Sequence, residues 1–165
     1  MITLRNYTDA DAAELLNLYR QTIRTVNSRD YDSEQIAAWA SDAIELEPWG
    51  TRFNDRFAYV AQLQNQTVGF ADMDAKGYLD RLFVSAAHQR QGIAKLLLCR
   101  LIADAREAGI ATITTAASIT AKPFFERFGF QVLQQQSVSC RGVWLTNYRM
   151  RLEIEPRSSS CSVAQ

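Results

Sequence analysis

The chain has 165 residues and a formal net charge of zero, with 47% hydrophobic and 22% charged residues. This is the composition of one globular domain, and without a basic excess we expect no binding to nucleic acid or to a membrane surface. No signal peptide is recognisable at the N-terminus, and no apolar run approaches the roughly 20 residues of a membrane span. Three widely spaced cysteines without a CxxC pair, and a single histidine, His88, predict neither a disulfide scaffold nor a metal site. We therefore expect a cytoplasmic protein.

The first half of the chain predicts one strand, two helices and three further strands. The strand covers Ile2–Asn6, and apolar periodicity predicts helices capped by Thr8 and by Ser33. The stretch that follows the second helix, with Trp49 and Phe53, has no clear period and predicts irregular structure. Alternating apolar residues then predict strands over Phe57–Leu63, Val68–Met73 and Tyr78–Val84.

The second half begins with a long amphipathic helix from Ile93, which Gly109 ends. A strand over Ile110–Thr115 and a short helix over Ala121–Phe128 follow. Two final strands are predicted over Phe130–Gln135 and Val143–Leu152.

The predicted order is β-α-α-β-β-β-α-β-α-β-β. Strands joined by short turns pair antiparallel, whereas the strands flanking the long helix pair parallel through a crossover. The prediction is an α/β (α+β) fold with a mixed, mostly antiparallel sheet of about seven strands, in a domain spanning residues 1–155. The serine-rich residues 156–165 are predicted to be a disordered tail.

The turn after the strand that ends at Val84 has the features of an anion site. Its sequence is Gln89-Arg90-Gln91-Gly92-Ile93-Ala94, and it opens the long helix. The first amides of a helix are unpaired and electropositive, so they can hold a pyrophosphate. The small side chains of Gly92 and Ala94 permit close approach, and Arg90 adds a charged donor. An ordinary helix start is the alternative; a P-loop and a Rossmann turn are excluded by residue type and glycine spacing.

Two segments resemble the GNAT superfamily of N-acetyltransferases. Gln89–Ala94 is similar to its motif A, written Q/R-x-x-G-x-G/A, and Ala121–Phe130 resembles its A-x-x-F-Y-E-K-x-G-F segment. Residues 117–127, together with Cys140-Arg141-Gly142 and Asn147-Tyr148, also resemble a bacterial subgroup, the YafP-like acetyltransferases. The resemblance covers roughly residues 2–152. It implies a twisted sheet with helices on both faces and acetyl-CoA (coenzyme A) as cosubstrate.

The resemblance also implies which residues bind the cofactor. The main chain of the strand end would pair with the pantetheine arm as an added strand does, and the motif A turn would hold the pyrophosphate. A serine stands where the family often has a cofactor-binding asparagine, and two phenylalanines would line the thioester end. The residues concerned are Leu82, Phe83, Val84, Gln89, Arg90, Gln91, Gly92, Ile93, Ala94, Ser118, Phe124 and Phe125.

Phe125 departs from the family pattern, because a tyrosine commonly stands there as the acid that protonates the leaving thiolate. Three explanations are open. Another donor serves, namely Cys140, Tyr78 or Tyr148; or water or the attacking amine supplies the proton; or the chain binds acyl-CoA without turnover. For Cys140, a small buried apolar role is the alternative.

Asp80 is the candidate general base, since it lies on the same strand face as Leu82 and Val84. A salt-bridged aspartate without a catalytic role is the alternative. Asp72 and Asp74 on the preceding strand are weaker candidates.

The acceptor is not identified by the sequence. Tyr31, Trp39 and Trp49 stand near acidic residues 42, 45 and 47 in the sequence, and aromatic walls with acidic groups suit a cationic amine. The alternative is that the aromatic residues pack in the core and the acidic residues form a solvated surface. The predicted function is transfer of an acetyl group from acetyl-CoA to a primary amine of a small molecule or peptide by direct attack, without a metal. The alternatives are an acyl-CoA-binding sensor or an acyltransferase with another acyl-CoA. A monomer and a homodimer are both possible.

Overall fold

A computed structural model describes residues 1–156. The predicted disordered tail therefore lies outside the described residues, apart from Pro156. Within residues 1–156, none of the helices combines the length and hydrophobicity needed to cross a bilayer.

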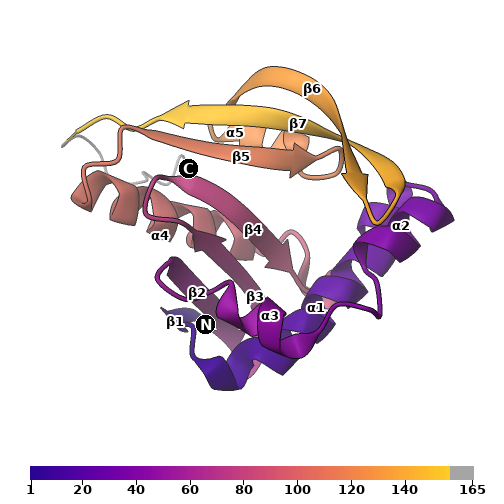
Figure 1. Cartoon of the computed structure of the whole chain (residues 1–165). Helices are drawn as coiled ribbons and strands as arrows, with labels where there is room; N and C mark the ends of the chain where they lie inside the picture. Colours follow the sequence, from indigo (N-terminus) through magenta and orange to yellow (C-terminus); the bar gives the residue numbers. More distant parts are fainter. Residues whose placement is uncertain (157–165) are drawn as a thin grey trace.

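Seven strands form one sheet in the order β1-β2-β3-β4-β5-β7-β6 (Figure 1). Every neighbouring pair is antiparallel except β4 and β5, which flank the long helix and pair parallel as predicted. The strands are β1 (Ile2–Asn6), β2 (Phe57–Leu63), β3 (Gln66–Met73), β4 (Tyr78–Val84), β5 (Thr112–Ser118), β6 (Gln131–Cys140) and β7 (Val143–Glu153).

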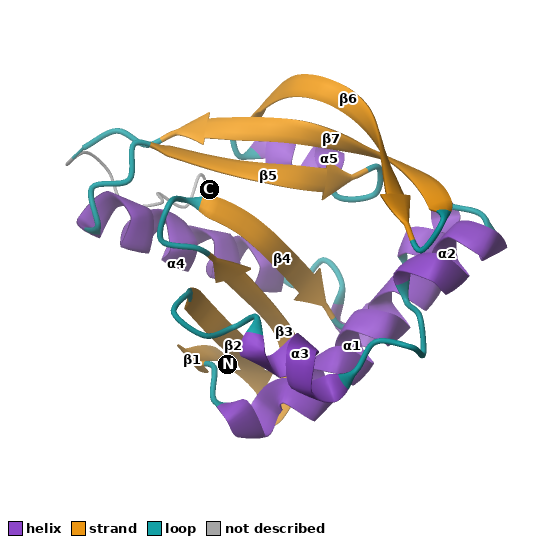
Figure 2. Cartoon of the chain, in the orientation of Figure 1, coloured by secondary structure: helices purple, strands orange, loops and turns teal. Residues whose placement is uncertain are grey.

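Helices cover both faces of the sheet (Figure 2). One face packs against α4 and α5 around Leu97, Met73 and Phe125, and the other packs against α1 and α3 around Leu15 and Phe70. The α-helices are α1 (Ala12–Thr25), α2 (Ser33–Trp39), α3 (Leu46–Thr51), α4 (Ile93–Glu107) and α5 (Lys122–Arg127), and short 3-10 turns cover Asp9–Asp11, Asn27–Arg29 and Ala86–His88.

The predicted element order is confirmed with one addition, the helix α3 in the stretch predicted to be irregular. Its six residues include a proline and a glycine, so local propensity does not predict it. Tertiary packing stabilises it: Trp49 is 3% exposed and donates its indole N–H to the Ala12 carbonyl at 3.0 Å. Trp49 is therefore a core residue.

The start of α2 differs from the prediction by one residue. Asp32, not Ser33, caps the helix, because its carboxylate accepts the Gln35 N–H at 2.8 Å. The Gln35 side chain accepts the Asp32 N–H at 2.9 Å in return, which completes a capping box.

The gap between β4 and β5 is the feature that positions the site. Only Tyr78 with Thr114 and Leu79 with Thr115 are paired, and beyond them the two strands diverge (Figure 1). The parallel sheet is thus open along the second half of β4.

One cysteine differs from the expectation that the chain has no disulfide scaffold: Cys99 in α4 is disulfide-bonded. Cys140 is a free thiol.

Asp11 at the start of α1 gives a pH-dependent prediction. Its carboxylate accepts two hydrogen bonds from Arg5, at 2.6 and 2.8 Å, and one from the Thr8 N–H at 2.8 Å. The Arg5 contact lowers the pKa of Asp11 below its ordinary 3.8, so the folded state binds fewer protons than the unfolded state as the pH falls through that value. We expect Asp11→Asn to destabilise the protein at pH 7, and the difference from wild type to shrink below about pH 4.

Urea unfolding at pH 7 and pH 3 measures this difference. Asp9→Asn is the control, because it removes a charge from the same turn without touching Arg5. An Asp11→Asn deficit that stays constant between the two pH values would contradict the assignment.

Candidate active site

A cavity of about 910 Å³ opens at the gap between β4 and β5. Its volume is that of a pocket for a large small-molecule ligand. All the predicted site residues line it except Gln91 and Tyr148. Residues from α1, α2, β4, the turn before α4, the first turn of α4, β5, α5, β6 and β7 contribute to its wall.

The main chain of β4 is partly unpaired where it borders the gap. The Ser85 N–H donates to the Val68 carbonyl at 2.8 Å, and antiparallel pairing alternates, so Leu82 and Val84 direct their N–H and C=O groups away from β3. The Val84 carbonyl accepts hydrogen bonds from Thr22 at 3.0 Å and from Gln89 at 2.8 Å. The Val84 N–H and both Leu82 groups face the gap without a strand partner in the described sheet, which suits an added strand-like ligand.

The N-terminus of α4 is open to an anion. Gly92 occupies the N-cap position with φ +82°, no side chain caps the first turn, and that turn contains no acid. Arg90 also has a positive φ, of 60°, and such alternation of left-handed residues turns successive N–H groups toward one point. A Cβ built on Gly92 would meet nothing within 4 Å. The space beside these amides is therefore free.

Three other predicted cofactor-binding residues also have structural roles. The side-chain amide N–H groups of Gln89 donate to the carbonyls of Val84 and Ser85, at 2.8 and 3.2 Å, so this side chain holds the end of β4 in place. Ile93 is 1% exposed and packs in the core. Ser118 lines the cavity, where its hydroxyl accepts the Ala121 N–H at 3.0 Å and thereby fixes the turn before α5.

Phe124 and Phe125 form the wall contributed by α5. Their rings lie 5.3 Å apart, and Phe125 also contacts Phe130 at 5.0 Å. Phe125 is 3% exposed, so this wall is dry and apolar and has no proton to donate.

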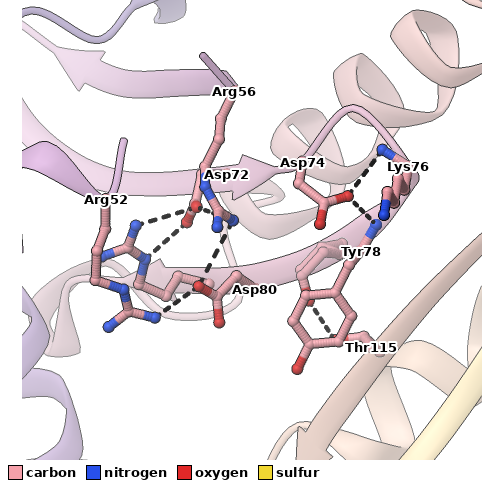
Figure 3. Close-up of polar contacts among 10 residues, drawn as sticks. Arg52, Arg56, Asp72, Asp74, Lys76, Tyr78, Asp80 and Thr115 are labelled. Carbon is pink, nitrogen blue, oxygen red and sulfur yellow. Dashed lines mark hydrogen bonds and ion pairs between the residues drawn. The ribbon is translucent and has the colours of Figure 1, made fainter. Parts of the chain in front are cut away.

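Asp80 sits at a β-bulge in β4. Asp72 pairs with Arg81 and Met73 with Leu79, which leaves Asp80 as the extra residue in the strand. Bulges re-aim side chains and occur often beside active sites. Asp80 lines the cavity and contacts Arg52 at 2.7 Å and Arg56 at 3.7 Å (Figure 3). It is thus both a cavity residue and an ion-paired one.

Asp72 and Asp74 have structural partners. Asp72 is fully buried and accepts hydrogen bonds from Arg81 at 2.8 and 3.1 Å, while Arg56 reaches it at 3.3 Å. Burial raises the pKa of Asp72, and the pairing with Arg81 opposes that effect. Asp74 accepts the N–H groups of residues 76 and 78, both at 2.9 Å, and so fixes the turn before β4 (Figure 3). Neither aspartate lines the cavity.

The three candidate proton donors differ in position. Cys140 lines the cavity, with its sulfur 3.6 Å from the Ala38 carbonyl. Tyr78 also lines it, and burial raises the pKa of its phenol. Tyr148 does not line it and instead lies under the Lys122 ammonium, 4.8 Å from the ring centroid. Asn147, the residue before it, does line the cavity, as do Leu145 and Thr146.

Two important cavity residues were not in the predicted site. Tyr19 of α1 contacts Phe83 with ring centroids 4.8 Å apart, and Arg52 follows α3 directly. Tyr19 stood only on a predicted apolar helix face, and Arg52 stood in a stretch without a pattern. Trp39 and Tyr31 line the cavity as expected, whereas acidic residues 42, 45 and 47 do not.

Comparisons with known proteins agree with this geometry. The Acetyltransferase (GNAT) domain family matches residues 27–152. The uncharacterized N-acetyltransferase YafP of Escherichia coli (strain K12) is 40% identical over 150 residues, which cover 91% of this chain and 95% of that protein.

Solved structures share the fold. A GCN5-related N-acetyltransferase from Rhodopseudomonas palustris superposes with a TM-score of 0.88 at 30% identity, covering 92% of this chain and 94% of the other. PaiA N-acetyltransferase from Thermoplasma acidophilum, in complex with coenzyme A, has a TM-score of 0.76 at 19% identity, covering 93% and 99%. YncA from Salmonella typhimurium, with acetyl-CoA, has a TM-score of 0.71 at 19% identity, covering 96% and 97%. The chain belongs to the GNAT family of N-acetyltransferases.

Proposed function

We propose that the chain transfers the acetyl group of acetyl-CoA to a primary amine by direct attack in a ternary complex. One observation carries the proposal: an uncapped helix N-terminus and an unpaired strand edge open on the same cavity, with Asp80 further along that strand. The helix start suits the pyrophosphate, and the Leu82 and Val84 main chain suits the pantetheine arm. The solved relatives that hold coenzyme A or acetyl-CoA support the same ligand.

In the proposed reaction, Asp80 accepts a proton from the acceptor ammonium, directly or through water. The amine nitrogen then bonds to the acetyl carbon, and the oxyanion that forms accepts a hydrogen bond from a main-chain N–H near Val84. Breakdown of this intermediate breaks the carbon–sulfur bond and releases the thiolate of coenzyme A. The second proton of the attacking nitrogen goes to the sulfur, so the atoms balance without a side-chain acid at Phe125.

Release of free thiol from acetyl-CoA in the presence of amines, with detection of the acetylated amine, tests the proposal. Thiol release matched by acetylated product supports it. Tight acetyl-CoA binding with no thiol release for any amine would favour a non-catalytic sensor. Faster release from succinyl-CoA than from acetyl-CoA would favour another acyl donor.

Asp80→Asn tests the base. An amide cannot take the proton, so we expect kcat to fall roughly a hundredfold at pH 7. The deficit shrinks as the pH rises, because a larger share of the amine is then already deprotonated. A pH–rate profile of the variant and the wild type measures this, and Asp42→Asn, an exposed ion-paired aspartate outside this cavity, is the control. Parallel profiles for Asp80→Asn and wild type would remove Asp80 from the mechanism.

A further inference from the structure

The charges on the cavity wall differ from those expected for a cationic acceptor. Asp80 is the one carboxylate among the described lining residues, whereas cationic side chains are contributed by Arg29, Arg52, Arg81, Arg90, Lys95 and Arg127. Arg90 and Lys95 belong to the motif A turn and the first turn of α4. Arg52 contacts Asp80. Asp80 precedes Val84 by four residues, so it lies roughly 13 Å along β4 from the turn that is proposed to hold the pyrophosphate.

The ion network around Asp80 has an excess of positive charge. Asp72 and Asp80 face the guanidinium groups of Arg52 and Arg56 (Figure 3). Asp72 also pairs with the guanidinium group of Arg81. Two carboxylates therefore balance only two of three cations. A cavity wall with an excess of positive charge attracts anions, so this end of the cavity favours an anionic group.

Two of these arginines have N–H groups that the ion pairs with Asp72 and Asp80 do not use. Arg81 is 4% exposed and lies between the rings of Trp49 and Phe53, at 4.7 and 4.0 Å, and within the described chain its NH1 atom has no hydrogen-bond partner. Arg52 has a side chain that is 53% exposed, and its contact with Asp80 uses one nitrogen, at 2.7 Å. Arg52 is thus the guanidinium that a ligand in the cavity can reach.

Aromatic rings border the same end. Phe83 contacts Tyr19 and Trp39 with centroids at 4.8 and 6.4 Å. Tyr19 and Arg52 both line the cavity. A flat apolar group has a matching surface here.

We propose that the acceptor is an amine with a carboxylate beside its amino group and a flat apolar side chain, as in an aromatic amino acid. The proposal rests on the acetyl transfer proposed above. The acceptor carboxylate binds Arg52, and its amino group lies against Asp80. Because Arg52 and Asp80 are 2.7 Å apart, they match a ligand whose opposite charges are close neighbours. Phe83, Tyr19 and Trp39 take the side chain.

Matched amines test the proposal. We expect phenylalanine to be acetylated with a kcat/KM at least tenfold above that of phenethylamine, which lacks only the carboxylate, and above that of spermidine, a polycation. Arg52→Gln lowers kcat/KM for phenylalanine by about tenfold to a hundredfold, the effect of losing one charge-assisted hydrogen bond. Because Arg52 also contacts Asp80, any effect of the variant through that carboxylate is shared by both amines. The ratio of the phenylalanine value to the phenethylamine value therefore falls by this factor, and the affinity for acetyl-CoA stays unchanged.

Arg100→Gln is the matched control. Arg100 is 50% exposed and pairs with Asp104 at 3.2 Å, but it lies outside the cavity lining. Arg52→Lys keeps the charge and restores part of the phenylalanine activity.

The outcomes separate this inference from the proposed function. A kcat/KM for phenethylamine or spermidine above that for phenylalanine overturns the inference and leaves acetyl transfer standing. So does an Arg52→Gln loss that is equal for phenylalanine and phenethylamine. Bound acetyl-CoA without thiol release for any amine overturns both.

Discussion

We expect acetyl-CoA to bind the Gly92→Val variant roughly a thousandfold more weakly than the wild type. The side chain of valine fills the open space beside the first amides of α4, where a Cβ meets nothing within 4 Å. It also strains a residue with φ +82° and so turns the amides away from their common point. Loss of two charge-assisted hydrogen bonds costs about 4 kcal/mol, which corresponds to that factor. Isothermal titration measures the affinity.

The Gly109→Val variant is the control that separates the loss of acetyl-CoA binding from the backbone strain that valine causes at a positive φ. Gly109 follows the other end of α4, has φ +74°, and likewise has no atom within 4 Å of an added Cβ. Both variants therefore lose similar stability, and only Gly92→Val loses acetyl-CoA. Equal affinities for the two variants would place the pyrophosphate elsewhere.

Asp72→Ala has the largest expected effect on stability. It leaves Arg81, which is 4% exposed, without its closest counter-ion, and breaking a buried pair in this way costs about 3–5 kcal/mol. That is a large share of the 5–15 kcal/mol, roughly, that stabilises a domain. Urea unfolding at pH 7 measures the loss.

Two variants control this experiment. Asp42→Ala removes the exposed partner of Arg24, and we expect little change in stability from it. Asp72→Leu combined with Arg81→Met removes both buried charges and recovers most of the stability that Asp72→Ala loses. A single Asp72→Ala variant as stable as Asp42→Ala would show that the pair contributes nothing.

The elements that sequence predicted well are those with a local cause. Strong periodicity predicts α4, and Gly92 and Ala94 mark its open start because these signals depend on neighbouring residues alone. The helix α3 has no such signal: its packing rests on Trp49, whose partner Ala12 lies 37 positions earlier in the chain. Long-range packing of this kind overrides weak local propensity.

The difference between local signals and long-range contacts also explains which site residues the sequence predicts. The positions of Gly92 and Phe125 follow from motifs, but the role of Asp80 depends on a bulge and on Arg52, which only folding brings to it. Tyr148 is a predicted site residue that the structure places outside the cavity lining. The cavity lining along β7 includes Asn147 but not Tyr148, and the resemblance of this segment to the family does not predict where that lining ends.

A structure of the protein with bound coenzyme A tests the central claim most directly. We predict that the pyrophosphate contacts the N–H groups that follow Gly92, and that the pantetheine arm pairs with Leu82 and Val84 in the gap beside β5. The sulfur then lies near Phe125, on the side of the cavity that Asp80 and Arg52 border. Coenzyme A bound away from the gap between β4 and β5 would contradict the account.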